Sequence, residues 1–363
     1  MEKRGSGGGA GVTESGEEGS EGRTLTVASY GGLANRLRVL TSAVVMAEAT
    51  GRALTMQWHQ MDTCGAAFSD LFTNDFPVAN YVGGPENRLP PFAGPLGRDY
   101  FDILTSTKPH IGVMAVSWLT LPEVYPHHAP LQAKCAAVLD GLTPVEEIAA
   151  RVKEFREAHF RPRMIGVHLR RGDFHREVRF SVTNTSTAIR AALRFLEAAP
   201  EAGIFLSTDD GALNQWTGQR MVEGAREQFR REFGERVVGT APRSLERGEP
   251  AAVQDALVDL LLLRGCDAGV GTWHSSFSEV AWFGRDVPVV LCRSGGVWGL
   301  VDVAGKRLGV WRGLNRWARR LTAGRANGLQ VIMYARGWPR ATAARLLRRH
   351  APGLFERVRP RKS

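Results

Sequence analysis

The sequence predicts an α/β protein with two lobes, each built on a parallel β-sheet. Short apolar segments typical of buried strands alternate with segments typical of helices between residues 24 and 291. The alternation occurs in two blocks, and a stretch rich in Pro and Gly lies between them at 83–130. Two successive blocks of this kind indicate two lobes with a ligand-binding cleft between them.

The composition is that of a globular protein. At roughly 150 residues per domain, 363 residues allow two domains, and 43% hydrophobic with 23% charged residues is ordinary for a folded core. No apolar run reaches the roughly 18 residues that a bilayer span needs, and the start does not have a signal-peptide pattern. The four cysteines lie far apart without a CxxC pair, which argues against a zinc module and a disulfide-rich secreted domain. We therefore expect reduced thiols in a cytoplasmic protein.

The net charge of +10 is concentrated at the C-terminal end of the chain. Residues 306–363 contain 16 Lys and Arg but one acid, so the rest of the chain has more acidic than basic side chains. An arginine-rich helix expected at 341–350 could lie on an anionic membrane, or it could pack on the first lobe with its basic face in solvent. Because the body is acidic and lacks patterns typical of RRM or KH modules, we expect no nucleic acid partner.

We expect four parts along the chain. They are a disordered tail rich in Gly, Ser and Glu at 1–22, a first Rossmann-like lobe at 23–160, a second lobe at 161–303 and a basic helical tail at 304–363.

The first lobe opens with a βαβ unit. A strand at 24–29, a glycine turn, a helix at 37–50 and a strand at 53–58 follow one another. A further strand is expected at 111–116, and the rest of 61–140 has the composition of loops and short helices. Thr143 as N-cap and Pro144 at the first helical position predict a helix that runs to about His159.

The second lobe alternates more regularly. Strands are predicted at 164–169, 203–207, 236–239, 268–271 and 287–291, and helices at 186–199, 218–233, 252–265 and 276–283. In an open α/β sheet, ligands bind where the strands end, so the residues after each strand are the candidate site.

The first strand is followed by Gly31, Gly32, Asn35 and Arg36. Glycines allow a close backbone approach, and a helix N-terminus with an Asn and an Arg suits an anion. The alternative is a tight βα turn with Arg36 in solvent. The spacing is not GxGxxG, so no dinucleotide cofactor is indicated.

The strand at 164–169 ends in His168, Arg170, Arg171 and Asp173. Two adjacent guanidiniums repel each other unless an anion or Asp173 lies between them, and a pyrophosphate would meet that need. The alternative is an Arg–Asp pair that only ties down the strand end.

Two acidic features follow. Asp209 and Asp210 come directly after the strand at 203–207, and one of them is expected to cap the next helix. Asp259 lies among leucines one turn after Asp255, so it needs a partner if it is buried. The alternative is that both Asp255 and Asp259 face solvent.

Ser275 and Ser276 stand between a strand and a helix. Hydroxyls in this position form a seat for phosphate or ribose, or they cap the helix. The chain has no Asp-x-Asp pair to hold a metal, no GxxxxGK[ST] loop and no GxSxG elbow. These absences lower the expectation of ATP hydrolysis and of serine hydrolase chemistry.

Four blocks together resemble the α1,6-fucosyltransferase and protein O-fucosyltransferase superfamily, which includes the rhizobial nodulation fucosyltransferases. They are Gly31-Gly-Leu-Ala-Asn-Arg36, His168-Leu-Arg-Arg-Gly-Asp173, Ser207-Thr-Asp-Asp210, and Asp259 with Gly271-Thr-Trp-His-Ser-Ser276. The resemblance extends over about residues 24–293. It implies a GT-B fold that binds GDP-fucose mainly through the second lobe, with inverting transfer and without a metal.

The resemblance also implies roles for single residues. Arg170 would hold the β-phosphate and stabilise the departing GDP, and His168 and Asp259 would face the guanosine. Glu177 is a candidate general base. The remaining residues implied in donor binding are Asn35, Arg36, Arg171, Asp173, Asp209, Asp210, Ser275 and Ser276.

The acceptor stays open between a surface polysaccharide, a lipid-linked oligosaccharide, a chitin-like oligomer and a protein hydroxyl. A lipid-linked acceptor would suit a basic tail that contacts the inner face of a membrane. Two other functions fit the same residues: a GDP-sugar-binding relative without turnover, and a transferase for another GDP-hexose. The chain departs from the animal members in having no expected membrane anchor, and His274 looks like an extra residue before the paired serines.

Overall fold

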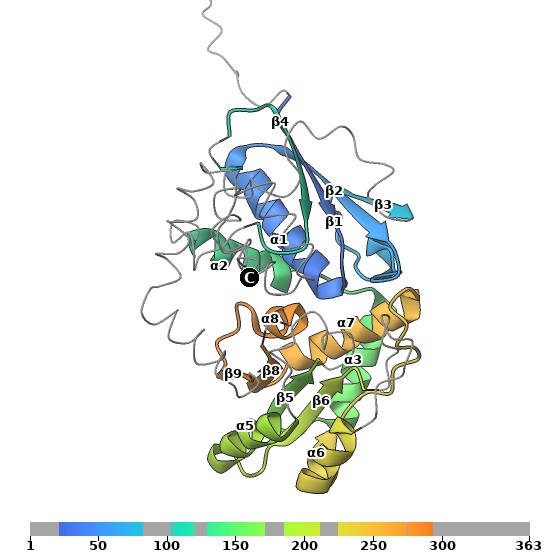
Figure 1. The fold of residues 1–363 in the computed structure, drawn as a ribbon, viewed down its shortest axis with the longest axis vertical. Coiled ribbons are helices and arrows are strands. Elements are labelled where there is room, and N and C mark those ends of the chain that lie inside the picture. The colour runs from blue at the N-terminus through green and yellow to red at the C-terminus, as the bar shows by residue number, and fades with distance from the viewer. Residues whose placement is uncertain are drawn as a thin grey trace, which may run out of the picture.

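The structure is a computed structural model, and it describes residues 22–82, 103–104, 106–119, 129–170, 185–210, 224–273 and 275–292. Within these ranges the chain forms two parallel β-sheets that lie at opposite ends of the molecule, with helices around and between them (Figure 1). The expected tails at 1–22 and 304–363 fall, apart from Gly22, outside the described residues.

The first sheet has the strand order β3-β2-β1-β4, and all its pairs are parallel. Its strands are β1 (Thr24–Ser29), β2 (Ala53–Gln60), β3 (Val78–Val82) and β4 (His110–Ala115). Helix α1 (Leu33–Thr50) connects β1 to β2 and ends at Gly51, whose φ of 58° is the left-handed conformation that glycine adopts most easily.

The second sheet has the order β7-β6-β5-β8-β9, again with parallel pairs. Its strands are β5 (Met164–Leu169), β6 (Gly203–Thr208), β7 (Val237–Val238), β8 (Ala268–Thr272) and β9 (Val289–Cys292). Every residue of β5, β6 and β8 is buried, as expected for central strands covered on both faces. The helices of this half are α5 (Thr185–Ala198), α6 (Ala225–Phe233), α7 (Pro250–Arg264) and α8 (Ser276–Trp282).

The region 61–140 is more regular than its sequence predicts. Besides β3, it contains the 3-10 turn η1 (Phe68–Asp70) and helix α2 (Ala129–Asp140). In the second half of the chain, the 3-10 turn η4 (Gly234–Arg236) precedes β7. Helix α3 (Glu146–His159) begins later than expected, with Val145 as its N-cap. The prediction of Thr143 as N-cap is wrong because backbone bonds tie this segment to the chain after η1: Thr73 N–H donates to Thr143 O, and Val145 N–H donates to Leu71 O.

Helix α3 packs with the second sheet. The rings of Phe155 on α3 and Phe205 on β6 lie edge to face with their centroids 5.6 Å apart. The expected boundary at residue 160 assigns α3 to the first lobe, whereas these contacts associate it with the second.

The two halves share one apolar core. Leu25 and Val27 of β1 belong to the same buried cluster as Leu260 and Leu263 of α7, which itself covers the second sheet. A smaller buried cluster lies on the other face of the second sheet, between α5, α6 and the strands. The lobes are therefore packed together through α7.

A backbone contact closes one side of the junction. The N–H of Gly65, in the loop after β2, donates to Arg247 O at 2.8 Å. A Cβ atom at Gly65 would lie 1.8 Å from Gly248 O, so only glycine allows this approach.

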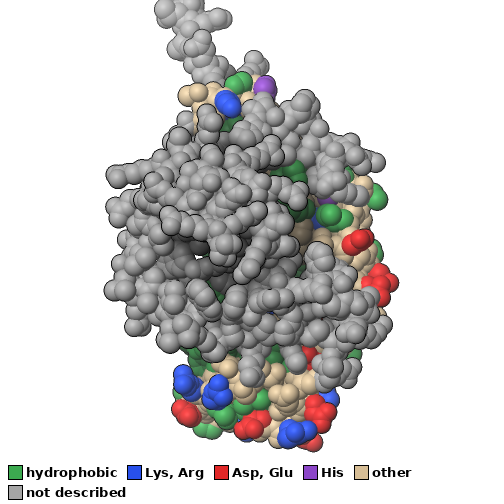
Figure 2. Space-filling view, viewed as in Figure 1, with side chains coloured by type: hydrophobic (Ala, Val, Ile, Leu, Met, Phe, Trp, Pro, Cys, Tyr) green, Lys and Arg blue, Asp and Glu red, His purple; other side chains and the backbone are tan. Residues whose placement is uncertain are grey.

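The outer end of the second lobe is mixed in charge. Figure 2 shows basic and acidic side chains interspersed at the lower end of the molecule, over α5 and α6. One pair there is Glu227–Arg231, 3.0 Å apart on α6. Among the helices of the described ranges, none combines the length and hydropathy required to cross a membrane.

Candidate active site

The carboxyl ends of β5 and β6 bring a basic and an acidic side chain together. His168 pairs with Ser207, and Leu169 with Thr208, so the next residues, Arg170 and Asp209, come off the sheet side by side. An Nη of Arg170 lies 3.1 Å from Asp209 Oδ2, and the two side chains are 20% and 14% exposed. The pair is thus partly exposed at the edge where ligands bind in such sheets.

The backbone of Arg170 is held by the neighbouring strand β8. The N–H of Arg170 donates to Thr272 Oγ1 at 2.9 Å, and the same hydroxyl donates to His168 O at 3.1 Å. This bond pattern fixes the point from which the Arg170 side chain leaves the sheet.

His168 is buried beside α8. Its Nδ1 lies 2.7 Å from Ser278 Oγ, which also accepts the N–H of Thr272 at 2.9 Å. Its ring packs against Phe277 with the centroids 4.8 Å apart. Burial lowers the pKa of His168 to about 3, and the nearby Arg170 adds to this while Asp209 opposes it. The imidazole is therefore neutral at physiological pH.

Ser278 adjoins the candidate site through its contact with His168, but it is not among the residues predicted from the sequence. It lies in the first turn of α8, so its sequence position is that of an ordinary helical serine. The available signal was its spacing of three residues from Ser275, which places both serines near one face of the helix.

Asp259 lies on α7 under the end of β6. Its Oδ2 accepts the hydroxyl of Ser207 at 2.7 Å, and its Oδ1 accepts that of Thr240 at 2.6 Å. Burial raises the pKa of the Asp259 carboxyl, although both hydroxyl bonds oppose the change. The structure thus gives the carboxylate the partners that the sequence analysis required of it.

Asp255 has a different surrounding, and the alternative in which it faces solvent is wrong. It is 4% exposed, and one carboxylate oxygen lies 2.6 Å from Arg151 on α3 and 2.9 Å from Arg243. These ion pairs connect α7 to α3 and to the loop that precedes α7, so Asp255 has a structural role.

The two adjacent carboxylates after β6 separate in role. Asp209 faces Arg170, whereas Asp210 accepts backbone N–H groups of Gly224 at 3.3 Å and Ala225 at 2.7 Å. Asp210 therefore caps α6, as one of the pair was expected to do. Successive residues of an extended chain point to opposite sides, which explains the division.

Ser275 and Ser276 lie where β8 passes into α8. Ser275 precedes the helix, and its side chain makes no capping bond; its carbonyl accepts the N–H of Glu279 at 3.0 Å. Ser275 therefore occupies the N-cap position, as the capping alternative expects, although its hydroxyl makes no bond to the helix backbone. Because Phe277 and Ser278 contact His168, this turn adjoins the end of β5.

In the first lobe, Asn35 and Arg36 fall in the first turn of α1, which begins earlier than predicted. Asn35 is half-buried, and its Oδ1 accepts a bond from Arg38 at 2.6 Å. Gly31 has a φ of +84°, and a Cβ there would lie 2.6 Å from Asn35 Nδ2. The glycine thus makes room for the amide group of Asn35.

Arg36 points into the core. It is fully buried, its Nε donates to Gly31 O at 2.9 Å, and its guanidinium lies 5.2 Å from the ring centre of Trp58. Within the part of the chain that the structure describes, its two terminal nitrogens have no hydrogen-bond partner. Burial lowers the pKa of the guanidinium. The implied role of Arg36 in donor binding does not agree with this position, and neither does the alternative that places it in solvent. One residue along a helix turns the side chain away from the face of Asn35.

Three predicted site residues, Arg171, Asp173 and Glu177, lie outside the described residues, as does His274. Their roles stay predictions. Across the described ranges, no group of three or more His, Cys, Asp and Glu side chains is arranged to hold a metal ion.

The chain is similar in structure to solved fucosyltransferases. One is a NodZ α-1,6-fucosyltransferase soaked with GDP-fucose, with 20% identity, a TM-score of 0.49, and coverage of 74% of this chain and 94% of that one. NodZ from Bradyrhizobium has 18% identity, a TM-score of 0.48, and coverage of 74% and 96%. POFUT1 in complex with GDP has 11% identity, a TM-score of 0.46, and coverage of 76% and 99%. No family model and no curated protein sequence matches the chain.

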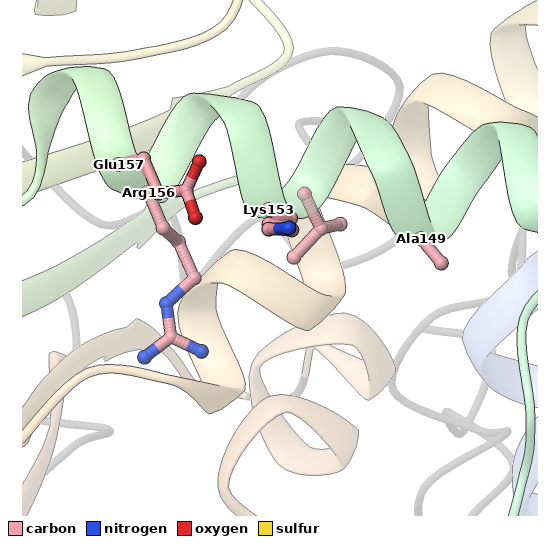
Figure 3. Close-up of a pocket in the computed structure, with 5 residues that line it drawn as sticks. Ala149, Lys153, Arg156 and Glu157 are labelled. Carbon is pink, nitrogen blue, oxygen red and sulfur yellow. The ribbon is translucent and has the colours of Figure 1, made fainter.

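A surface pocket of about 350 Å³ lies away from the strand ends. The described residues that line it all belong to α3: Ala149, Val152, Lys153, Arg156 and Glu157 (Figure 3). A Cβ at Gly265, which precedes β8, would lie 3.4 Å from the guanidinium of Arg156. The pocket is thus near the amino-terminal edge of the sheet, opposite to the ligand edge of an open α/β sheet.

Proposed function

We propose that this chain is a glycosyltransferase that moves fucose from GDP-fucose to a hydroxyl group of a glycan or a protein. The observation that supports this most directly is the Arg170–Asp209 pair at the ligand edge of the second sheet, beside neutral His168. The pair joins two of the sequence blocks on which the resemblance to fucosyltransferases rests, and Thr272 of a third block accepts the backbone N–H of Arg170.

Arg170 is proposed to hold the β-phosphate of the donor. As the bond between fucose C1 and the phosphate oxygen breaks, its electron pair passes to the GDP, and negative charge grows on the diphosphate. A guanidinium aimed at that oxygen lowers the barrier, by about 3 to 4 kcal/mol if it resembles one oxyanion-hole donor. Asp209, 3.1 Å away, orients the guanidinium before the donor arrives.

The guanosine is proposed to bind near Asp259 and His168. Guanine carries N–H donors on its pairing edge, and a carboxylate is an acceptor with two lone pairs on each oxygen. Asp259 is held by Ser207 and Thr240, so it presents a fixed acceptor. Ser275 and Ser276 would line the phosphate and ribose.

The acceptor hydroxyl is proposed to attack C1 from the side opposite to the diphosphate, which inverts that centre. The new C1–O bond forms while the bond to GDP breaks, and the acceptor proton passes to a base, for which Glu177 is the candidate. Arginine supplies the positive charge that a metal supplies in other transferases, so we propose a metal-independent reaction.

Calorimetric titration tests the donor class. The purified protein is titrated with GDP, GDP-fucose, GDP-mannose, UDP and ADP in the presence of EDTA. We expect binding of GDP and GDP-fucose and none of UDP or ADP. Binding of GDP-mannose in place of GDP-fucose would identify another GDP-hexose as donor, and an absence of nucleotide binding would contradict the proposal.

Transfer is then measured with the acceptor classes named above, with and without EDTA. Equal rates are expected, whereas strict dependence on Mg²⁺ or Mn²⁺ would contradict the metal-independent mechanism. Donor binding without turnover on any acceptor, or with water, would favour a non-catalytic binding protein.

A further inference from the structure

A chain of polar contacts crosses between the lobes beside Asn35. Arg38, one turn into α1, donates from one Nη to Asn35 Oδ1 at 2.6 Å and to Val116 O at 2.9 Å. Its other Nη donates to Glu279 Oε2 at 2.8 Å, although Glu279 lies 241 residues later on α8. The second carboxylate oxygen of Glu279 accepts the indole N–H of Trp118 at 2.6 Å.

These contacts fix the orientation of the Asn35 side-chain amide, that is, which way its oxygen and its NH₂ group point. A guanidinium has only donors, so the amide atom that faces Arg38 must be the oxygen. The NH₂ group is then directed to the other side, against Gly31, where a Cβ would come within 2.6 Å of it. Arg38 therefore leaves Asn35 a donor of hydrogen bonds at the start of α1.

Glu279 supplies the charge that keeps Arg38 in place. The Arg38 side chain is 13% exposed; its burial lowers the pKa of the guanidinium, and the Coulombic attraction and hydrogen bond of Glu279 oppose this. A buried guanidinium without its carboxylate partner is costly, so removing Glu279 should release Arg38 from this position.

The same short helix also belongs to the second lobe's site. Ser278 and Phe277, next to Glu279, contact His168, and Ser275 and Ser276 precede them. One turn of α8 thus touches both the proposed donor seat and the residue that orients Asn35.

We infer that Arg38 and Glu279 are positioning residues that couple the donor seat on α8 to Asn35 of the first lobe. This inference rests on the proposed function. The Asn35 NH₂ group would donate a hydrogen bond to the diphosphate–sugar part of the donor. Neither Arg38 nor Glu279 touches the donor itself.

The matched control is Glu48, which also belongs to an ion pair of α1. Its carboxylate lies 2.9 Å from Lys134 on α2, and both side chains are more than half exposed. Glu48→Ala removes a carboxylate of the same kind from a contact that does not involve Asn35. Glu279→Gln keeps an acceptor for Trp118 and removes only the charge, so it carries the test if Glu279→Ala or Arg38→Met fails to fold.

The first experiment observes Asn35 directly, without any nucleotide. In protein labelled with ¹⁵N-asparagine, the side-chain NH₂ signal of Asn35 is assigned by its loss in Asn35→Asp. We expect it to shift in Glu279→Ala, Glu279→Gln and Arg38→Met and to stay in place in Glu48→Ala. An unmoved signal in the folded Glu279 and Arg38 variants would overturn the inference.

The second experiment is a double-mutant cycle on GDP-fucose affinity, measured by calorimetry. Glu279→Ala should weaken binding about 5-fold in the wild-type background and less than 2-fold when Asn35 is already Ala, because coupled residues are not additive. Equal losses in both backgrounds would contradict coupling through Asn35. A wild-type protein that binds no GDP-sugar would instead contradict the proposed function, and the NMR result would still decide the orienting role of Arg38 and Glu279.

Discussion

His168 and Arg170 lie two residues apart at the end of β5, yet their surroundings give them different charges. Burial keeps the imidazole neutral, whereas the guanidinium stays partly exposed and paired with Asp209. A neutral ring next to the cation avoids repulsion at the point where an anion would bind. The site thus places its positive charge on one side chain that is fixed by its backbone and by its partner.

The role of Arg170 can be tested by Arg170→Ala. We expect the transfer rate to fall about 100-fold or more, as on removal of one oxyanion-hole donor. The fold should be retained, because the side chain lies at the edge of the sheet outside the apolar core. Transfer is measured under saturating donor, with circular dichroism as the check on folding. A variant that keeps more than a tenth of the wild-type rate would show that Arg170 is not the phosphate clamp.

The depressed pKa of His168 predicts a pH dependence of stability. Between pH 6.5 and about 3 the unfolded chain binds a proton at this histidine and the folded protein does not. The free energy of unfolding should therefore fall as the pH is lowered through this window, by up to about 1.4 kcal/mol per pH unit for this group.

Urea unfolding at several pH values measures this dependence. The comparison is with His168→Gln, which lacks the titrating ring but has the same carboxylates. We expect the slope of stability against pH to be smaller in the variant. Identical slopes for both proteins would rule out a buried, neutral His168.

At the scale of elements, the neighbours Asp209 and Asp210 form a matched pair. Asp210→Ala removes the cap of α6 and should lower the free energy of unfolding by about 1 to 2 kcal/mol, with little effect on GDP affinity. Asp209→Ala should weaken GDP binding or transfer with a smaller effect on stability. Thermal unfolding and calorimetry on both variants separate the two effects. The assignment is wrong if the two variants exchange these properties.

The elements that sequence patterns predict well are those bounded by clear breaks. The strands β1, β5, β6 and β8 are short segments rich in apolar residues, and their predicted ranges agree with the structure to within a residue. Strand β3 and helix α2 were missed. Strand β3 is a partly exposed strand at the sheet edge, and α2 has a proline at its second position within a Pro-rich stretch.

The site shows where prediction from sequence stops. Arg170 and Asp209 were each predicted as site residues from their places after a strand, but the ion pair between them was not, because it depends on the order of strands in the sheet. The burial of Arg36 against Trp58 could not be read, since a lone arginine normally indicates solvent. Arg38 and Glu279 are 241 residues apart in the sequence, so no local sequence pattern predicts their contact.

For the whole molecule, the shared core predicts cooperative unfolding. Helix α7 contributes Leu260 and Leu263 to a cluster that also holds the first sheet, so neither half can bury its apolar surface alone. We expect one calorimetric transition, with the calorimetric and van't Hoff enthalpies equal. Two separate transitions, or a fragment 22–145 that folds by itself, would contradict this expectation.

The four cysteines can report on how fast each half of the protein opens locally. All four are buried thiols, and burial raises the pKa of Cys266 to about 12 and that of Cys292 to about 11. Thiols of this kind react with a disulfide reagent only when the surrounding structure opens. Because Cys64 belongs to the shared core and Cys292 to the smaller cluster, their labelling rates report on the two parts separately. Thiol labelling of the wild-type protein can thus measure the rate of local opening of each half. It can also show whether a bound nucleotide lowers that rate in one half or in both.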